Sequence, residues 1–173
     1  MPRIDSRKFS VIASRLLYDR AEVASMVTVD LPSIALATQD VAGPGVMGSI
    51  NMPVTGGVNS METTITMRGH SYDAGKLMRP GEHKMELRFA QDSFTVQQGI
   101  RPEGCKIFMT VIFKSAEGGS IKNMEFSERA FTYEVRRYEE YVDGEQTVLI
   151  DKWGIKYQMV GEDGMQDVRG FIY

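Results

Sequence analysis

Residues 61–68 read Met61-Glu-Thr-Thr-Ile-Thr-Met-Arg68, an alternation of side chains that decides the fold class. Successive side chains of a β-strand point to opposite faces of a sheet, so this stretch predicts a strand with one buried face and one wet face. The face expected to be buried carries Met61, Thr63, Ile65 and Met67. The face expected to be wet carries Glu62, Thr64, Thr66 and Arg68. We therefore expect a chain built from half-exposed strands.

The same alternation occurs before this strand and, in a more apolar form, after it. At residues 27–31 apolar side chains alternate with Thr28 and Asp30, and Pro32 then bends or interrupts the strand. Lys106–Lys114 is so apolar that both of its faces are expected to be covered. Both segments predict strands.

A hairpin is predicted near the C-terminal end. Residues 125–142 alternate again, and Asp143-Gly144 connects them to Thr147–Ile150. Asp-Gly between two alternating runs is a strong short-range signal for a tight hairpin turn. Together with the strands above, it predicts a mainly β, antiparallel fold.

A long stretch without regular periodicity lies between the early strands. Residues 39–59 include two prolines and several glycines, which is turn chemistry and not a helical pattern. We expect a long, exposed loop or a loose hairpin here.

One short helix is predicted at Ser71–Met78. Ser71 is a suitable N-cap, Tyr72 and Lys76 lie one turn apart, and Pro80-Gly81 would end the helix.

Length and composition set broad limits. A chain of 173 residues fits one domain with its own core, so residues 1–173 are expected to form a single domain. Cys105 is the only cysteine, which indicates a buried structural thiol and a reducing compartment. The chain has no apolar run of signal-peptide or membrane-span length, so we expect it to be soluble and cytoplasmic when made.

The charges are balanced and dispersed. Twenty Lys and Arg oppose 23 Asp and Glu, giving a net charge of -3 at pH 7, and the two signs are interspersed. Non-specific affinity for nucleic acid needs clustered cations that contact phosphates. This composition argues against a basic surface that binds nucleic acid.

No motif predicts chemistry. Gly43-Pro-Gly-Val-Met-Gly48 fits the glycine pattern of dinucleotide-binding loops, but Pro53 and two more glycines follow where that mechanism needs a helix. His70, His83 and Cys105 show no metal-ligand spacing, and both histidines are expected to be solvated. Nothing near the cysteine marks an activated thiol. We therefore predict no catalytic, metal-binding or cofactor-binding residue, and a protein that is not an enzyme.

Three short stretches stand out along the chain: Val27-Thr-Val-Asp-Leu-Pro-Ser-Ile34, Val41-Ala-Gly-Pro-Gly-Val-Met-Gly48 and the hairpin from Tyr141 to Lys152. They resemble the major tail tube protein family of contractile-tailed phages and R-type bacteriocins. They occur in the family's order, and the resemblance covers residues 25–165. The segment 1–24 is longer and more charged than the family pattern, and Gly164–Tyr173 departs from its usual basic ending.

The resemblance implies a fold and an assembly. The fold would be an antiparallel β-barrel or sandwich with one short helix, and its subunits would form hexameric rings around one closed inner barrel. Closure would protect strand edges that otherwise template aggregation. Rings would stack into a hollow tube, and the long loop Asp40–Asn59 would reach the neighbouring ring. Its candidate inter-ring residues are Asp40, Gly43, Gly45, Gly48, Gly56, Gly57 and Asn59.

A conduit needs an inner wall that is polar but does not hold DNA tightly. The wet sides of the two early strands fit that requirement. The candidate lumen-lining residues are Thr28, Asp30, Glu62, Thr64 and Thr66. Any half-exposed sheet shows the same alternation, so placing this face in the lumen rests on the resemblance.

The resemblance also implies partners and a location. The partners are further copies of the chain, the tail sheath protein beside the short helix, baseplate proteins that start the tube, the tape measure protein and, in a phage, DNA in the lumen. No membrane anchor is implied. The protein would lie in a virion tail or tail-like particle, assembled in the host cytoplasm. Two alternatives stay open, namely the tube of an R-type bacteriocin or secretion-like injection machine, and a monomeric β-barrel binding module.

Overall fold

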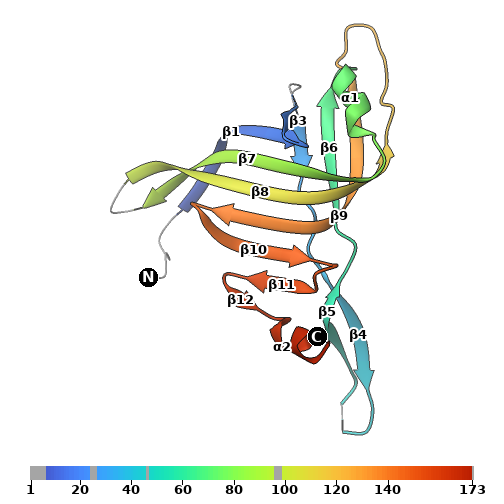
Figure 1. The fold of residues 1–173 in the computed structure, drawn as a ribbon, viewed down its shortest axis with the longest axis vertical. Coiled ribbons are helices and arrows are strands. Elements are labelled where there is room, and N and C mark those ends of the chain that lie inside the picture. The colour runs from blue at the N-terminus through green and yellow to red at the C-terminus, as the bar shows by residue number, and fades with distance from the viewer. Residues whose placement is uncertain (1–6, 24–26, 46, 96–98, 173) are drawn as a thin grey trace.

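The computed structural model describes residues 7–23, 27–45, 47–95 and 99–172, which are mainly β, as predicted (Figure 1). Within these residues ten strands form one antiparallel sheet. They are β1 (Arg7–Tyr18), β2 (Ala21–Glu22), β3 (Val27–Asp30), β6 (Glu62–Arg68), β7 (Glu82–Thr95), β8 (Gly99–Ala116), β9 (Glu128–Val142), β10 (Glu145–Asp151), β11 (Lys156–Met159) and β12 (Glu162–Asp163). A separate hairpin contains β4 (Leu36–Ala42) and β5 (Ser49–Val58), and the helices are α1 (Tyr72–Leu77) and α2 (Gln166–Ile172).

The large sheet branches at β9. Its strand order is β12-β11-β10-β9-β8-β7-β1-β2, with β6 and β3 as a side branch. Residues Glu128–Glu134 of β9 pair with β6, and residues Arg137–Val142 pair with β10, while β8 holds the other edge beside both halves. The sheet thus divides into a β6–β3 branch and a β10–β11–β12 branch, and its path does not close within the described part of one protomer.

The alternation at residues 61–68 is confirmed in β6, where every second side chain is fully buried. Met61, Ile65 and Met67 pack in the same apolar cluster as Phe131 of β9. Thr63 is equally buried, and its hydroxyl donates to the Asp30 carbonyl at 2.8 Å. The one polar group on the inner side of this strand therefore has its hydrogen bond.

The helix predicted at Ser71–Met78 is present as α1. Ser71 has the extended backbone of an N-cap, although its hydroxyl makes no capping hydrogen bond. Ala74 and Leu77 are buried, and the Tyr133 hydroxyl donates to the Leu77 carbonyl at 2.8 Å. These contacts hold α1 against the core.

The predicted turn at Asp143-Gly144 also forms and joins β9 to β10. Both residues have a positive φ, 51° and 84°. Two central residues with positive φ match the right-handed twist of the flanking strands, which is why Asp-Gly is favoured here.

Several elements were not predicted from the sequence, and β1 and α2 are the longest of the terminal ones. β1 lies inside the N-terminal segment 1–24, pairs with β7 and buries Leu16 and Tyr18. Register shifts between Lys8 and Ala13 interrupt the period-two pattern that would have revealed this strand. α2 is a second helix, whereas the sequence predicted only one helix, at Ser71–Met78.

Two predictions about single side chains have opposite outcomes. Cys105 is buried as expected, and burial raises the pKa of its thiol. The expectation of a solvated His83 is wrong, because its side chain is only 12% exposed. Its Nδ1 lies 2.7 Å from Asp19 Oδ2, and its ring stacks on Tyr18. Tyr18 ends β1, the strand that the sequence did not reveal, and Asp19 follows it directly.

Candidate functional site

The wet sides of β3 and β6 form one surface with the adjoining residues of β9. We call this surface the polar face. Thr28 lies opposite Thr66, and Asp30 lies opposite Thr64. Residues directly opposite each other in antiparallel strands point to the same side of the sheet. Glu62 lies two positions before Thr64 on β6, so all five candidate lumen residues share this face.

The polar face extends onto β9. Ala130, Thr132 and Glu134 lie opposite the three candidate residues of β6. These residues alternate with the fully buried Phe131 and Tyr133. The alternation was visible in the sequence, but the pairing of β9 with β6 was not, so the sequence did not include these residues in the candidate surface.

Two carboxylates of the polar face are paired with cations. Glu62 forms an ion pair with Lys114 of β8. Glu134 lies 2.8 Å from Lys152 Nζ and accepts a hydrogen bond from Ser60 Oγ at 2.6 Å. Burial raises the pKa of Glu134, whereas the hydrogen bonds from Lys152 and Ser60 lower it, and the net pKa is below its usual value. Both pairs reduce the net charge of the polar face without removing its polarity.

The stretch predicted as a long loop or a loose hairpin is a hairpin, and it projects away from the large sheet (Figure 1). Val41 lies opposite Ile50, and Asp40 lies opposite Asn51. The Asn51 side chain donates to Asp40 Oδ1 at 2.7 Å, which marks one side of the hairpin as polar. The other side, which we call the apolar face of the hairpin, carries Val41, Ile50, Met52 and Val54, all between 41% and 52% exposed.

Three of the candidate glycines have left-handed backbone. Gly45 and Gly48 have φ of 92° and 95°, a conformation that side chains with a Cβ rarely adopt. Gly56 has φ of 75°, and a Cβ there would lie 2.5 Å from the Met165 Cε. Met165, the residue just before α2, is buried and packs over the base of the hairpin at Gly56. Val46 of the predicted loop lies outside the described residues.

The remaining candidate loop residues occupy the tip and the base of the hairpin. Gly43 follows β4, has an ordinary φ and has open space where a Cβ would lie. Gly57 lies in β5, where a Cβ would be 3.1 Å from the Ala37 Cβ. The Asn59 amide donates to the Ala35 carbonyl at 2.9 Å. These residues therefore belong to one hairpin and not to a disconnected loop.

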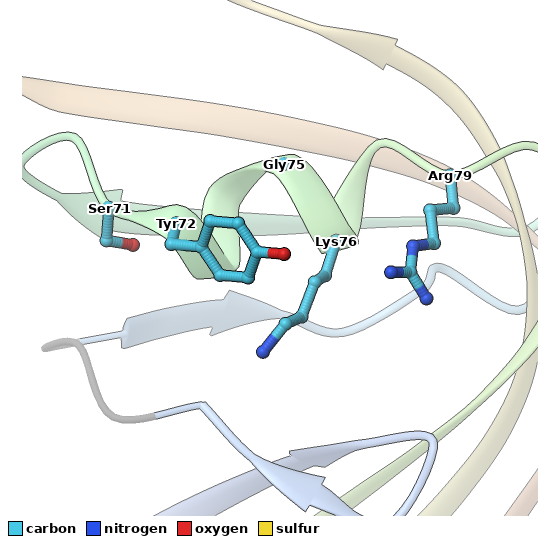
Figure 2. A pocket seen from close by; sticks show the side chains of 5 residues that line it. All are labelled: Ser71, Tyr72, Gly75, Lys76 and Arg79. Atoms are coloured by element: carbon cyan, nitrogen blue, oxygen red, sulfur yellow. The ribbon is translucent and has the colours of Figure 1, made fainter.

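A shallow pocket lies beside α1 (Figure 2). The side chains of Tyr72, Lys76 and Arg79 extend on the same side of the helix. Lys76 Nζ lies 2.8 Å from Asp73 Oδ1 and 5.2 Å from the centre of the Tyr72 ring. Lys76 thus already has a carboxylate and an aromatic partner.

Among the described residues, no three or more His, Cys, Asp or Glu lie together in a way that could hold a metal ion. None of the helices in this part of the chain is both long and apolar enough to cross a membrane. Two surfaces stand out among the described residues: a polar strand face and a protruding amphipathic hairpin.

Comparison with known families gives these surfaces a context. A family model described as phage tail tube protein FII matches residues 10–172. The chain belongs to this phage tail tube family. No curated protein matches it. The tail tube match begins within β1 and ends with α2, so it extends into both terminal segments, 1–24 and 164–173, that depart from the expected family pattern. As a tail tube protein, the chain is a structural component of a phage-type tail.

Proposed function

We propose that this chain builds the tube of a contractile phage tail, as hexameric rings that stack into a hollow conduit through which DNA passes. The observation that carries this proposal is the tail tube family match over residues 10–172. Residues 1–173 act as one tube domain, without catalytic activity, a metal or a cofactor. The work of the protein is to assemble and to leave a passable channel.

The polar face suits the wall of that conduit. It presents threonines and carboxylates, and two of the carboxylates are paired with lysines. DNA binds surfaces with clustered, unpaired cations, because each contact between a cation and a phosphate releases counterions. A wall of neutral hydroxyls and balanced ion pairs gives passing phosphates little to bind, so we assign Thr28, Asp30, Glu62, Thr64 and Thr66 to the lumen.

Ring closure uses strand edges that a single protomer leaves open. Among the described strands, β3 pairs with β6 alone, so its other edge has no partner within the protomer. An unpaired strand edge is a template for another chain. In a ring, a neighbouring protomer covers this edge, and the polar faces of the six protomers join into one inner barrel.

The β4–β5 hairpin makes the contact between rings. It extends beyond the large sheet, and its apolar face is uncovered. A two-stranded hairpin is marginally stable in water by itself. The segment Asp40–Asn59 therefore gains its main stabilisation when the next ring covers it.

The tube works with other tail components. The sheath protein lies outside the tube next to α1, baseplate proteins start the first ring, and the tape measure protein and DNA occupy the lumen. The rings assemble in the host cytoplasm and remain in the virion tail. An R-type bacteriocin or another injection particle could use a tube of the same construction, and genes for a capsid and a terminase beside this one would assign it to a phage.

Electron microscopy of the purified full-length protein tests the proposal. We expect hollow rods of uniform diameter with six-fold symmetry in cross-section, and a melting temperature that rises with protein concentration because assembly stabilises the folded subunit by mass action. A monomer that stays monomeric at all concentrations would contradict the proposal and favour a binding module.

A further inference from the structure

A second uncovered apolar surface lies at the opposite end of the molecule from the hairpin. The connection between β8 and β9, residues 117–127, extends past α1 at one end of the longest axis, and the β4–β5 hairpin extends at the other (Figure 1). Ile121 and Phe126 of this connection are each 82% exposed, and Met124 is fully exposed. Large apolar side chains that are exposed to solvent and close together in the sequence are candidates for a protein–protein contact.

Polar groups surround these apolar side chains. Arg68 lies over the Phe126 ring, with its guanidinium carbon 5.3 Å from the ring centre, and it also pairs with Glu128 at 3.1 Å. Lys122 pairs with Glu125 at 3.3 Å. An apolar centre within a rim of satisfied charges is the usual composition of a protein–protein contact.

We propose that the apolar face of the hairpin of one protomer docks onto the 117–127 connection of a second copy in the adjacent ring. This inference rests on the proposed function and names the receiving surface of the inter-ring contact. It joins Val41, Ile50 and Met52 of one copy to Ile121, Met124 and Phe126 of the next.

Charge and position both favour a second copy as the occupant. Asp40 is the only charged side chain of the hairpin, and it is bonded to Asn51 on the polar side, so the apolar face can be buried without desolvating a charge. The two surfaces differ from each other and lie at opposite ends of the molecule's longest axis. A contact between two different surfaces of identical subunits repeats without closing on itself, which produces an open-ended stack.

Disulfide trapping tests the pairing directly. Ile50→Cys and Met124→Cys are made separately and together, and Cys105 stays in place because it is buried. Under mild oxidation of assembled rods, we expect dimers when the two single variants are mixed and a ladder of longer covalent chains from the double variant. The wild-type protein should give no cross-link.

The possible failures are distinguishable. Rods that give no cross-link between the two positions would overturn the docking pair and leave the tube function in place. Cross-linking of Ile50→Cys with itself would also overturn it, because the hairpins would then meet each other. Absence of rods from the wild-type protein would contradict the tube function and this contact together.

Charge substitution gives a second, independent readout. We expect Ile50→Asp or Met124→Lys alone to raise the critical concentration for rod growth about tenfold or more, equivalent to ~1.4 kcal/mol per contact. The combined variant should recover part of the loss, because the two new charges attract. Ile100→Asp is the matched control, since Ile100 is 71% exposed and lies at the start of β8, opposite Phe94 of β7 and outside both surfaces. Normal rods from Met124→Lys would overturn the proposal.

Discussion

The β6–β3 branch and the β4–β5 hairpin are both antiparallel pairs with polar outer sides, yet they differ in what lies behind them. Behind β6, Met61, Ile65 and Met67 are fully buried against the core. Behind the hairpin, the apolar residues of β5 remain about half exposed. Strand pairing alone therefore does not determine whether a segment is stable by itself; a covered apolar side does. The β6–β3 branch has its cover within the protomer, and the hairpin lacks one.

Truncation of an apolar side chain should affect the two regions very differently. Phe131→Ala removes a fully buried ring behind β6, and we expect it to lower the free energy of unfolding by about 3–5 kcal/mol. Val54→Ala in the hairpin, a smaller truncation of a half-exposed side chain, should cost less than ~1 kcal/mol in the unassembled protein. Chemical denaturation at concentrations too low for rod growth measures both. Equal losses would show that the hairpin is already covered within the protomer.

Substitution of hairpin glycines should give a graded series. Gly56→Val combines a positive φ, which costs about 1–2 kcal/mol, with a collision against Met165. Gly48→Val has the positive φ but open space, and Gly43→Val has neither constraint. We expect folded protomers from Gly48→Val that fail to elongate, near-normal rods from Gly43→Val, and the largest loss from Gly56→Val. Circular-dichroism melts and rod lengths by electron microscopy measure the series, and normal rods from Gly48→Val would show that this turn does not carry ring stacking.

Acid should weaken the sheet more than the hairpin. Burial raises the pKa of Asp151. The hydrogen bond from the Gly154 N–H and the guanidinium groups of Arg136 and Arg137 lower this pKa by more than burial raises it, so the net pKa lies below the usual 3.8. A carboxylate with a lowered pKa in the folded state stabilises the protein above pH ~4, and this contribution is lost as the pH falls through the folded-state pKa. Asp151→Asn should therefore lower the melting temperature at pH 7, with a difference from wild type that shrinks below pH ~4. Asp40→Asn, on the exposed hairpin, is the control, and an equal effect from it would contradict the assignment.

Charge reversal on the polar face should have the smallest effect on stability and a visible effect on transport. Asp30→Lys with Glu62→Lys removes the exposed ion pair to Lys114, which is worth about 0–1 kcal/mol. We expect intact rods, but slower DNA release from particles that carry both substitutions, because the added cations bind phosphates. Time-resolved release measures this. A tube reconstruction with both lysines on the outer wall would sink the lumen assignment.

The regular strands could be predicted because their periodicity is local. β6 and the first half of β9 alternate without interruption, and Asp143-Gly144 fixes one hairpin. The gathering of the five candidate lumen residues on one face follows from the same alternation, once β3 pairs with β6. For these elements the alternation of neighbouring residues is enough to predict the strand and the face on which each side chain lies.

The elements that the sequence did not predict depend on pairing with distant strands, or have a periodicity that is interrupted or hidden by neighbouring residues. β1 carries register shifts, and the branching of β9 depends on pairing with strands far away in the sequence. The apolar face of the hairpin had a signal, because Ile50, Met52 and Val54 alternate along β5. The surrounding glycines and prolines indicated a loop and hid that alternation.

The branch at β9 also determines how the subunit responds to force. One continuous strand is bonded to β8 along one edge and to β6 and then β10 along the other. A pull along β9 loads both of its ladders in shear, so many hydrogen bonds must break together before the strand slides. The hairpin is attached mainly through its two chain ends and the packing of Met165 over Gly56. Under tension the large sheet should therefore resist deformation. The hairpin should bend where it joins the sheet and accommodate small misalignments between neighbouring subunits.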